Sequence, residues 1–357
     1  METIEPPAGA HLTTIAARDD LPLAVETRGS INAPAVLFAH GFGQSRHAWA
    51  RAAEGLAMHG WRTVTFDARG HGDSGRLADG HYVLEQFVDD LLIVARSLEA
   101  PPVLVGASMG GLLGLVAAGE SKPLLKKCDP ALFQRAESGA CPDSASTDQA
   151  LSELDPRRVV RDPHHQGVSQ HPGGPAPFRA LVLVDITPRW ESGGVERMLG
   201  FMRAHPQGFA SLDEAADAVA AYLPQRRRRK DRYELAQLLH RGADGRLRWH
   251  WDPALLDTVA REGERHQQRL LNAARNIDVP VLLVSGGRSD IVSEDTVAEF
   301  LEAVPHARHV EIPHATHTLA GDNNAAFTAA IEPFLNTLDS GVVPAPRSRA
   351  AIQRGLP

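Results

Sequence analysis

Residues 102–111 read PVLVGASMGG and continue into the apolar segment LLGLVAAG at 112–119. A β-branched run that passes through glycines into an apolar helix-like segment predicts a strand, a sharp corner and a helix. The corner fits the pattern G-x-S-x-G, with Ser108 between Gly106 and Gly110. In such a corner the serine hydroxyl stands exposed above the sheet, and backbone N–H groups can receive a developing oxyanion. Ser108 is therefore a candidate nucleophile, and the plainer alternative is a turn that is simply rich in glycine and serine.

Short apolar runs alternate with helix-like segments along the rest of the chain, which predicts βαβ units and a mostly parallel sheet. The expected strands are 11–17 and 23–27 (an antiparallel opening pair), 35–39, 63–67, 103–105, 181–186, 281–285 and 310–312. The clearest expected helices are 49–58, 83–98 and 325–338. The fold class is α/β.

The order of these elements suggests how the chain is divided. Residues 1–187 and 277–339 form the two parts of the α/β core. Residues 188–276 are mostly helical by pattern and follow the carboxyl end of a strand, where ligands bind in open α/β sheets. We interpret this stretch, the cap segment, as a helical cap. Residues 121–177 are rich in turn-forming residues and predict a flexible insertion, and the Pro- and Arg-rich tail at 340–357 predicts disorder.

Composition limits the possible partners. A net charge of −7 and a pI near 6.2 argue against a nucleic-acid surface, and the basic run RRRRK at 226–230 is interpreted as a solvated helix end. The two cysteines, Cys128 and Cys141, argue against a disulfide framework and fit a reducing compartment. We find neither a signal-peptide pattern nor an apolar run long enough to cross a bilayer. We therefore expect a cytoplasmic protein without a membrane partner.

A serine hydroxyl needs a base, and the base needs an orienting acid. Asp290 follows the expected strand 281–285, and His317 follows the last one. The chain order Ser108, Asp290, His317 is typical of serine hydrolases with this corner. We assign His317 as base and Asp290 as acid. Two alternatives stay open: Asp185, at the end of the run LVLVD, for the acid, and His314 for the base.

The oxyanion requires two donors. The N–H of Met109 directly follows the nucleophile, and the N–H of Phe42 lies in the glycine-rich loop after strand 35–39. His40 is expected to support this loop through hydrogen bonds rather than to act catalytically. His71, in another glycine-rich loop, is interpreted as a packing and hydrogen-bonding residue.

The cap segment offers large side chains for a substrate pocket, although apolar residues at helical spacing serve core packing more often. The candidates are Trp190, Met198, Phe201, Met202, Tyr222, Trp249 and Trp251. Three further histidines, His164, His165 and His171, lack a surrounding cysteine or carboxylate framework and are interpreted as part of a solvated loop. We expect neither a metal nor a cofactor.

Taken together, six motifs resemble those of the α/β-hydrolase superfamily. They are HGFG at 40–43, DARGHGDS at 67–74, GASMGG at 106–111, LVLVD at 181–185, GGRSD at 286–290 and the histidine at 317. The resemblance covers roughly residues 11–118 and 178–338. It implies a mostly parallel eight-stranded sheet flanked by helices, a helical cap inserted between late strands, and a Ser-His-Asp triad that needs no cofactor.

Within that superfamily the chain is similar to serine esterases, enol-lactonases and cofactor-free haloperoxidases. Ser108 separates it from related dehalogenases and epoxide hydrolases, which carry aspartate at this position. The expected function is hydrolysis of a carboxylic ester or related small acyl compound through an acyl-enzyme. The alternatives are perhydrolysis or haloperoxidation, C–C bond hydrolysis and acyl transfer at the same triad, and, outside catalysis, a ligand-binding module.

Overall fold

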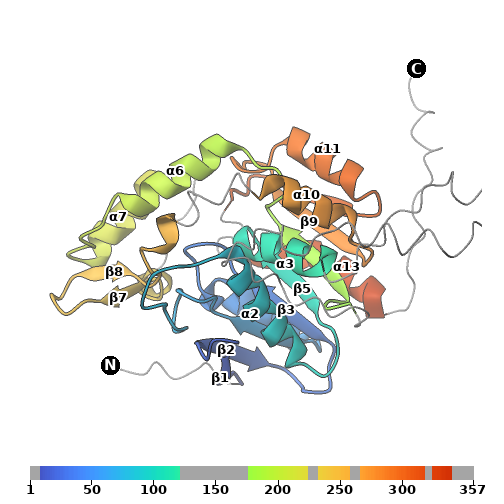
Figure 1. Ribbon diagram of the computed structural model, residues 1–357, viewed down its shortest axis with the longest axis horizontal. Helices are drawn as coiled ribbons and strands as arrows, with labels where there is room; N and C mark the ends of the chain where they lie inside the picture. Colours follow the sequence, from blue (N-terminus) through green and yellow to red (C-terminus); the bar gives the residue numbers. More distant parts are fainter. Residues whose placement is uncertain (1–8, 121–175, 224–231, 258–265, 318–323, 340–357) are drawn as a thin grey trace, which may run out of the picture.

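The computed structural model describes residues 9–120, 176–223, 232–257, 266–317 and 324–339 (Figure 1). Its centre is an eight-stranded sheet in the order β1-β2-β4-β3-β5-β6-β9-β10. The strands are β1 (His11–Ala16), β2 (Pro22–Arg28), β3 (Ala35–Ala39), β4 (Arg62–Phe66), β5 (Val103–Ala107), β6 (Ala180–Val184), β9 (Val281–Gly286) and β10 (Arg308–Ile312). Every strand expected from the sequence is present, with its ends shifted by at most a few residues.

The strand directions explain where a site can form. β2 is antiparallel to both β1 and β4, whereas all other neighbouring pairs are parallel. The carboxyl ends of β3, β5, β6, β9 and β10 therefore meet at one edge of the sheet. Ligands of open α/β sheets bind at this edge, and the loops that leave it carry the candidate catalytic residues.

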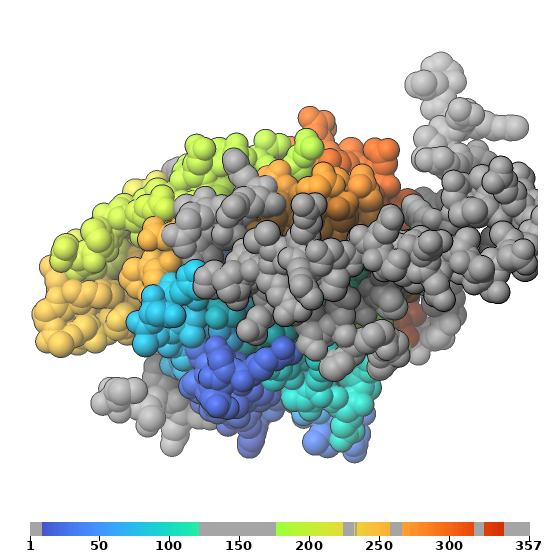
Figure 2. Space-filling view, in the orientation of Figure 1, coloured from blue at the N-terminus to red at the C-terminus, as the bar shows by residue number. Residues whose placement is uncertain are grey.

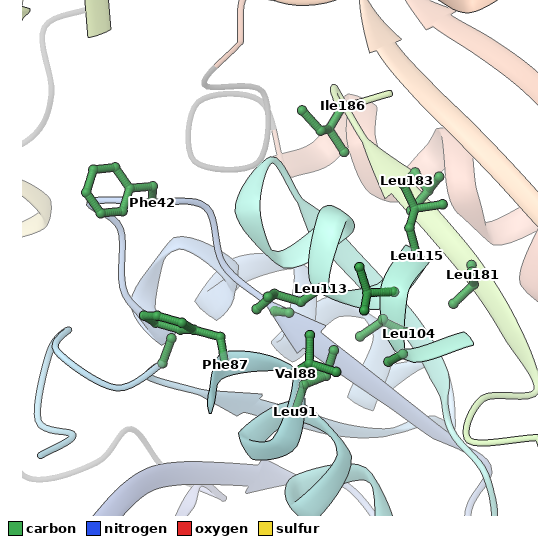
Figure 3. Packing of buried hydrophobic residues seen from close by; sticks show 14 of the residues in the cluster. Phe42, Phe87, Val88, Leu91, Leu104, Leu113, Leu115, Leu181, Leu183 and Ile186 are labelled. Atoms are coloured by element: carbon green, nitrogen blue, oxygen red, sulfur yellow. The ribbon is translucent and has the colours of Figure 1, made fainter. Parts of the chain in front are cut away.

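Both faces of the sheet are buried at its centre, which is why the central strands β3, β5 and β6 are apolar runs without polar alternation. Leu104, Leu181 and Leu183 point to one face, which is covered by helices α2 (Leu84–Arg96), α3 (Met109–Gly119), α10 (Gln267–Arg275) and α11 (Glu294–Ala303). Figure 3 shows these three leucines beside Leu113 and Leu115 of α3. This packing fixes α3, and with it the corner that precedes α3.

The opposite face carries the alternate residues of the same strands, such as Val103, Val105 and Val182. It is covered by α1 (Ala50–Met58), which follows the short 3₁₀ helix η1 (Arg46–Trp49), and by α13 (Asn324–Asp339). Trp49 and Phe327 pack against each other across these helices, with ring centroids 5.5 Å apart. Helices on both sides of the sheet complete a three-layer α/β sandwich.

The cap segment contains a small sheet as well as helices. Its elements are α6 (Ser192–Arg203), α7 (Leu212–Tyr222), α8 (Arg232–Ala236), β7 (Leu239–Arg241), β8 (Leu247–Trp249) and α10. Periodicity indicated the helices but not the antiparallel pair β7–β8, whose strands are three residues long. In Figure 2 the yellow-green and gold atoms of this segment form the upper left of the molecule, above the blue and cyan core.

Several expectations fall on residues that the structure does not describe. They are most of the insertion expected at 121–177, the basic run at 226–230, the loop histidines at 164, 165 and 171, both cysteines and the tail at 340–357. Within the described ranges, none of the helices has the length and apolar character needed to cross a membrane.

Candidate active site

The corner after β5 has the geometry that its glycines predicted. Ser108 adopts φ +46° and ψ −116°, and its N–H donates to the Val184 carbonyl of the neighbouring strand at 3.1 Å. A Cβ on Gly106 would lie 2.5 Å from the Gly110 carbonyl oxygen, and a Cβ on Gly110 would lie 2.4 Å from that of Ala39. Only glycine fits at both positions, so the chain can turn tightly enough to present Ser108 at the start of α3.

The loop after β3 packs directly against this serine. A Cβ on Gly41 would lie 3.3 Å from the Ser108 Cβ. Gln44 closes the loop, because its side-chain oxygen accepts the Gly41 N–H at 3.1 Å while its own N–H donates to the Gly41 carbonyl at 3.1 Å. Phe42, Ser108 and Met109 line the same cavity, and the role of the Phe42 and Met109 N–H groups as oxyanion donors stays a prediction.

Two buried histidines support this loop from below. The His40 ring nitrogens lie 2.8 Å from the Gly41 carbonyl and 2.9 Å from the Ala68 N–H, and those of His71 lie 3.0 Å from the Arg69 carbonyl and 3.2 Å from the Gly43 N–H. Each ring donates one proton and accepts another, so each is neutral. Burial lowers the pKa of His40 and brings the pKa of His71 well below 6.5. Both are structural residues, as expected from the sequence.

A third buried histidine, His250 of the cap segment, accepts the Gly72 N–H at 2.8 Å and lies 6.4 Å from the His71 ring. Burial lowers the pKa of His250 to about 3. The unfolded chain therefore binds more protons than the folded one between about pH 6.5 and pH 3, so stability falls as the pH falls through this range.

We expect His250 to cost about 1.4 kcal/mol of unfolding free energy for each pH unit below 6.5, or about 2 kcal/mol at pH 5. Urea unfolding at pH 7.5 and pH 5 measures the loss. His250→Gln keeps an acceptor for Gly72 without a titrating ring, so its loss between the two pH values should be smaller by that amount. Equal pH dependence in the two proteins would contradict this assignment.

The structure places Asp185 against His317. The Nδ1–H of His317 donates to Asp185 Oδ2 at 2.8 Å. Asp185 is fully buried with φ +50°, and its carboxylate also accepts the Gly286 N–H at 2.7 Å and the Ser289 hydroxyl at 2.5 Å. Because Ala107 pairs with Val184 in adjacent strands, Asp185 follows β6 at the level where Ser108 follows β5. His314, the alternative base, is exposed.

The expected contact between Asp290 and His317 is therefore wrong, and the alternative acid, Asp185, holds that position. Asp290 instead forms an ion pair with Arg197 of α6. Its carbonyl would lie 2.2 Å from a Cβ on Gly194, so the start of α6 packs tightly on this loop. Asp290 thus holds the cap segment. Ser289, which the sequence analysis did not select, orients Asp185.

Comparisons with known proteins agree with this fold. The family model of the alpha/beta hydrolase fold matches residues 34–129, which include β3, β4, β5 and the Ser108 corner. The chain has the α/β-hydrolase fold. Esterases and other hydrolases are among its relatives, which places it with the enzymes of that class.

Three known hydrolases illustrate how similar this chain is to its relatives. The 3-hydroxybutyrate-oligomer hydrolase of Cupriavidus necator is 25% identical over 303 residues, covering 80% of this chain and 83% of that protein. Esterase Rv0045c of Mycobacterium tuberculosis is 24% identical over 314 residues, covering 86% and 84%. The solved structure of E-2-(acetamidomethylene)succinate hydrolase superposes with a TM-score of 0.67 at 21% identity, covering 92% of this chain and 99% of that one.

A cavity of about 150 Å³ opens beside Ser108 in this α/β hydrolase. Phe42, Met109 and Ser108 form the wall that carries the candidate chemistry. The other walls come from α2, α3, α6, α10 and the residues that follow β6, through side chains that include Phe87, Leu112, Ile186, Trp190, Val195, Met198 and Leu270. The cavity therefore lies between the sheet edge and the cap segment.

The residues proposed for a pocket from the sequence divide into three groups. Trp190 lines the cavity, as does Met198. Met202 and Trp251 are buried against the loop after β3, since a Cβ on Gly43 would lie 2.6 Å from the Met202 Cε and the Trp251 ring lies 6.2 Å from that of Phe42.

Phe201, Tyr222 and Trp249 are the third group, and they pack on one another instead of lining the cavity. Phe201 stacks on Tyr222 with centroids 4.3 Å apart and meets the edge of Trp249 at 5.8 Å. These rings hold α6, α7 and β8 together, so their expected role in substrate binding is not supported. The sequence offered no means to separate packing aromatics from lining ones, because both recur at helical spacing.

Among the described residues, no group of three or more His, Cys, Asp or Glu side chains is arranged to hold a metal ion.

Proposed function

We propose that this α/β hydrolase cleaves carboxylic esters through an acyl-enzyme, with Ser108 as nucleophile, His317 as general base and Asp185 as the acid that orients it. The observation that carries the proposal is the 2.8 Å hydrogen bond from His317 Nδ1 to the buried Asp185 carboxylate, at the sheet edge where the Ser108 corner also lies. Relatives named for oligoester or ester hydrolysis support an ester as the substrate.

In the proposed mechanism, the hydrogen bond to Asp185 keeps the proton of neutral His317 on Nδ1, so the lone pair of Nε2 is free to accept the Ser108 proton. The serine oxygen attacks the ester carbonyl, and the negative charge that develops on the carbonyl oxygen is received by the N–H groups of Phe42 and Met109. His317 then returns its proton to the leaving alkoxide, and the alcohol departs.

Deacylation repeats these steps with water as the nucleophile. His317 takes a proton from water, the hydroxide attacks the acyl carbonyl, and Ser108 leaves with the proton that His317 returns. The buried Asp185 stabilises the imidazolium in both halves. Its carboxylate is held in place by three hydrogen bonds, from Gly286, Ser289 and His317.

In the proposed enzyme, the cap segment covers the active site. Trp190 and Met198 line the cavity, and Met202 and Trp251 pack on the loop that presents Phe42. Helix α6 thus supports both the cavity and the proposed oxyanion loop.

A fluorophosphonate probe tests the nucleophile directly, because it reacts with serines that a neighbouring base activates. We expect stoichiometric labelling of the wild-type protein at Ser108, located by peptide mass spectrometry. His317→Ala keeps the serine but removes the base, so it should label at least 100-fold more slowly. Absence of labelling in folded wild-type protein, or labelling at another serine, would overturn the proposal.

A further inference from the structure

The cavity beside Ser108 adjoins the proposed reacting groups. The part of a substrate that fills this cavity therefore belongs to the ester that Ser108 cleaves. Ser108, Phe42 and Met109 form one of its walls. The chemistry of the remaining walls therefore determines which esters bind productively.

The described part of those walls carries almost no polarity. The lining side chains from α2, α3, α6 and α10 are apolar, and among the described residues that line the cavity His266 is the only titratable one. No Lys, Arg, Asp or Glu side chain belongs to this described lining. A charged substituent entering here would lose its hydration without gaining a partner, which costs several kcal/mol.

The arginines next in sequence to lining residues, within the part of the chain that the structure describes, are already paired elsewhere. Arg197, beside Met198, forms its ion pair with Asp290. Arg269, beside Leu270, binds Glu85 at 2.6 Å and Glu120 at 2.7 Å. Neither guanidinium is free to receive a substrate carboxylate.

Size sets the second limit. An apolar cavity of about 150 Å³ in a protein core holds one molecule as large as benzene, which has six carbons. The cavity here has the same volume, about 150 Å³, but it is open on one side, so the volume limits the part of a substrate chain that is buried rather than the length of the whole chain. Each methylene buried in such a site is worth about 0.8 kcal/mol, which corresponds to roughly a four-fold gain in kcat/KM.

We propose that this cavity selects uncharged esters that carry one unbranched apolar group of about six carbons, and that it rejects esters with a carboxylate on that group. This inference rests on the proposed ester hydrolysis and specifies its substrate class. The apolar group can belong to the acyl part or to the alcohol part of the ester, and the two arms of the test distinguish these sources.

The first experiment measures kcat/KM of the wild-type protein for p-nitrophenyl esters from acetate to dodecanoate, and for the acetate esters of alkanols from ethanol to dodecanol. We expect a rise of about three- to four-fold per methylene in one of the two series, ending near six carbons. A rise in the acyl series assigns the cavity to the acyl chain, and a rise in the alcohol series assigns it to the alcohol. The p-nitrophenyl monoester of hexanedioic acid should react at least 100-fold more slowly than the hexanoate.

The second experiment fills the cavity from α6. Val195→Phe adds bulk to the lining, whereas Glu196→Trp adds bulk at the next, exposed position of the same helix. The preference for a six-carbon over a two-carbon group should fall about ten-fold or more in Val195→Phe and should be retained in Glu196→Trp.

The results distinguish failure of this inference from failure of the proposed function. Turnover that is independent of chain length in both series, or equal turnover of the hexanoate and the charged monoester, would overturn the inference while leaving ester hydrolysis intact. Failure to turn over any ester, together with failure of fluorophosphonate labelling, would overturn the proposed function and the inference with it.

Discussion

Ser108→Ala should lower kcat/KM for p-nitrophenyl esters by about 10⁴- to 10⁶-fold, because no other group can form the acyl-enzyme and only binding and oxyanion contacts would remain. The loss should appear in kcat. Steady-state kinetics with p-nitrophenyl butyrate, on protein free of contaminating esterases, measures it.

The fold should survive this change. Alanine has the same Cβ as serine. The substitution therefore adds no strain to the backbone at φ +46° and no clash with the closely packed Gly41. The melting temperature should stay within about 2 °C of wild type. Ser97→Ala, at an exposed position after α2, is the matched control and should retain full activity. Turnover of Ser108→Ala within ten-fold of wild type would refute the nucleophile assignment.

Asp185→Asn should lower kcat by about 10³- to 10⁴-fold, because an amide facing Nδ1 no longer fixes the productive tautomer of His317 or stabilises its cation. Asparagine tolerates the left-handed backbone conformation at this position, φ +50°, and its side-chain oxygen can still accept the Gly286 N–H. The substitution therefore removes the charge with little cost to the fold.

Asp290→Asn is the decisive comparison. Its ion pair with Arg197 is partly exposed to solvent, and such pairs contribute about 0–1 kcal/mol. We expect kcat within about three-fold of wild type and a small decrease in stability. Parallel measurement of the two variants on one ester distinguishes the acids. A large loss in Asp290→Asn with a small loss in Asp185→Asn would restore the assignment made from sequence and reject the pairing in the structure.

The fold followed from sequence because local and long-range signals agreed. The apolar runs 35–39, 103–105 and 181–186 are buried on both sides, and such runs form central parallel strands with little ambiguity. The corner at Ser108 was equally clear, since glycine is required at 106 and 110 by close backbone contacts. The β7–β8 pair was missed because strands of three residues leave no periodicity to read.

The acid could not be chosen from sequence with the same certainty. Asp185 and Asp290 both follow strands whose carboxyl ends lie at the same sheet edge, so the chain order from which Asp290 was chosen does not separate them. Three features of the folded chain determine which carboxylate faces His317. They are the positive φ of Asp185, the Ser289 hydroxyl that orients the Asp185 carboxylate, and the ion pair between Arg197 and Asp290. Arg197 lies on an amphipathic helix, where periodicity indicates only that it faces away from the core.

Residues 287–293 connect two parts of the molecule that could otherwise change independently. Ser289 holds the carboxylate beside His317, while Asp290 and Ile291 hold the start of α6, whose Val195 lines the cavity. We therefore expect a substitution on α6 that changes the cavity to shift this loop and, through Ser289, the Asp185 carboxylate. We expect a cap segment taken from another protein of this fold to fit here only together with its own version of this loop.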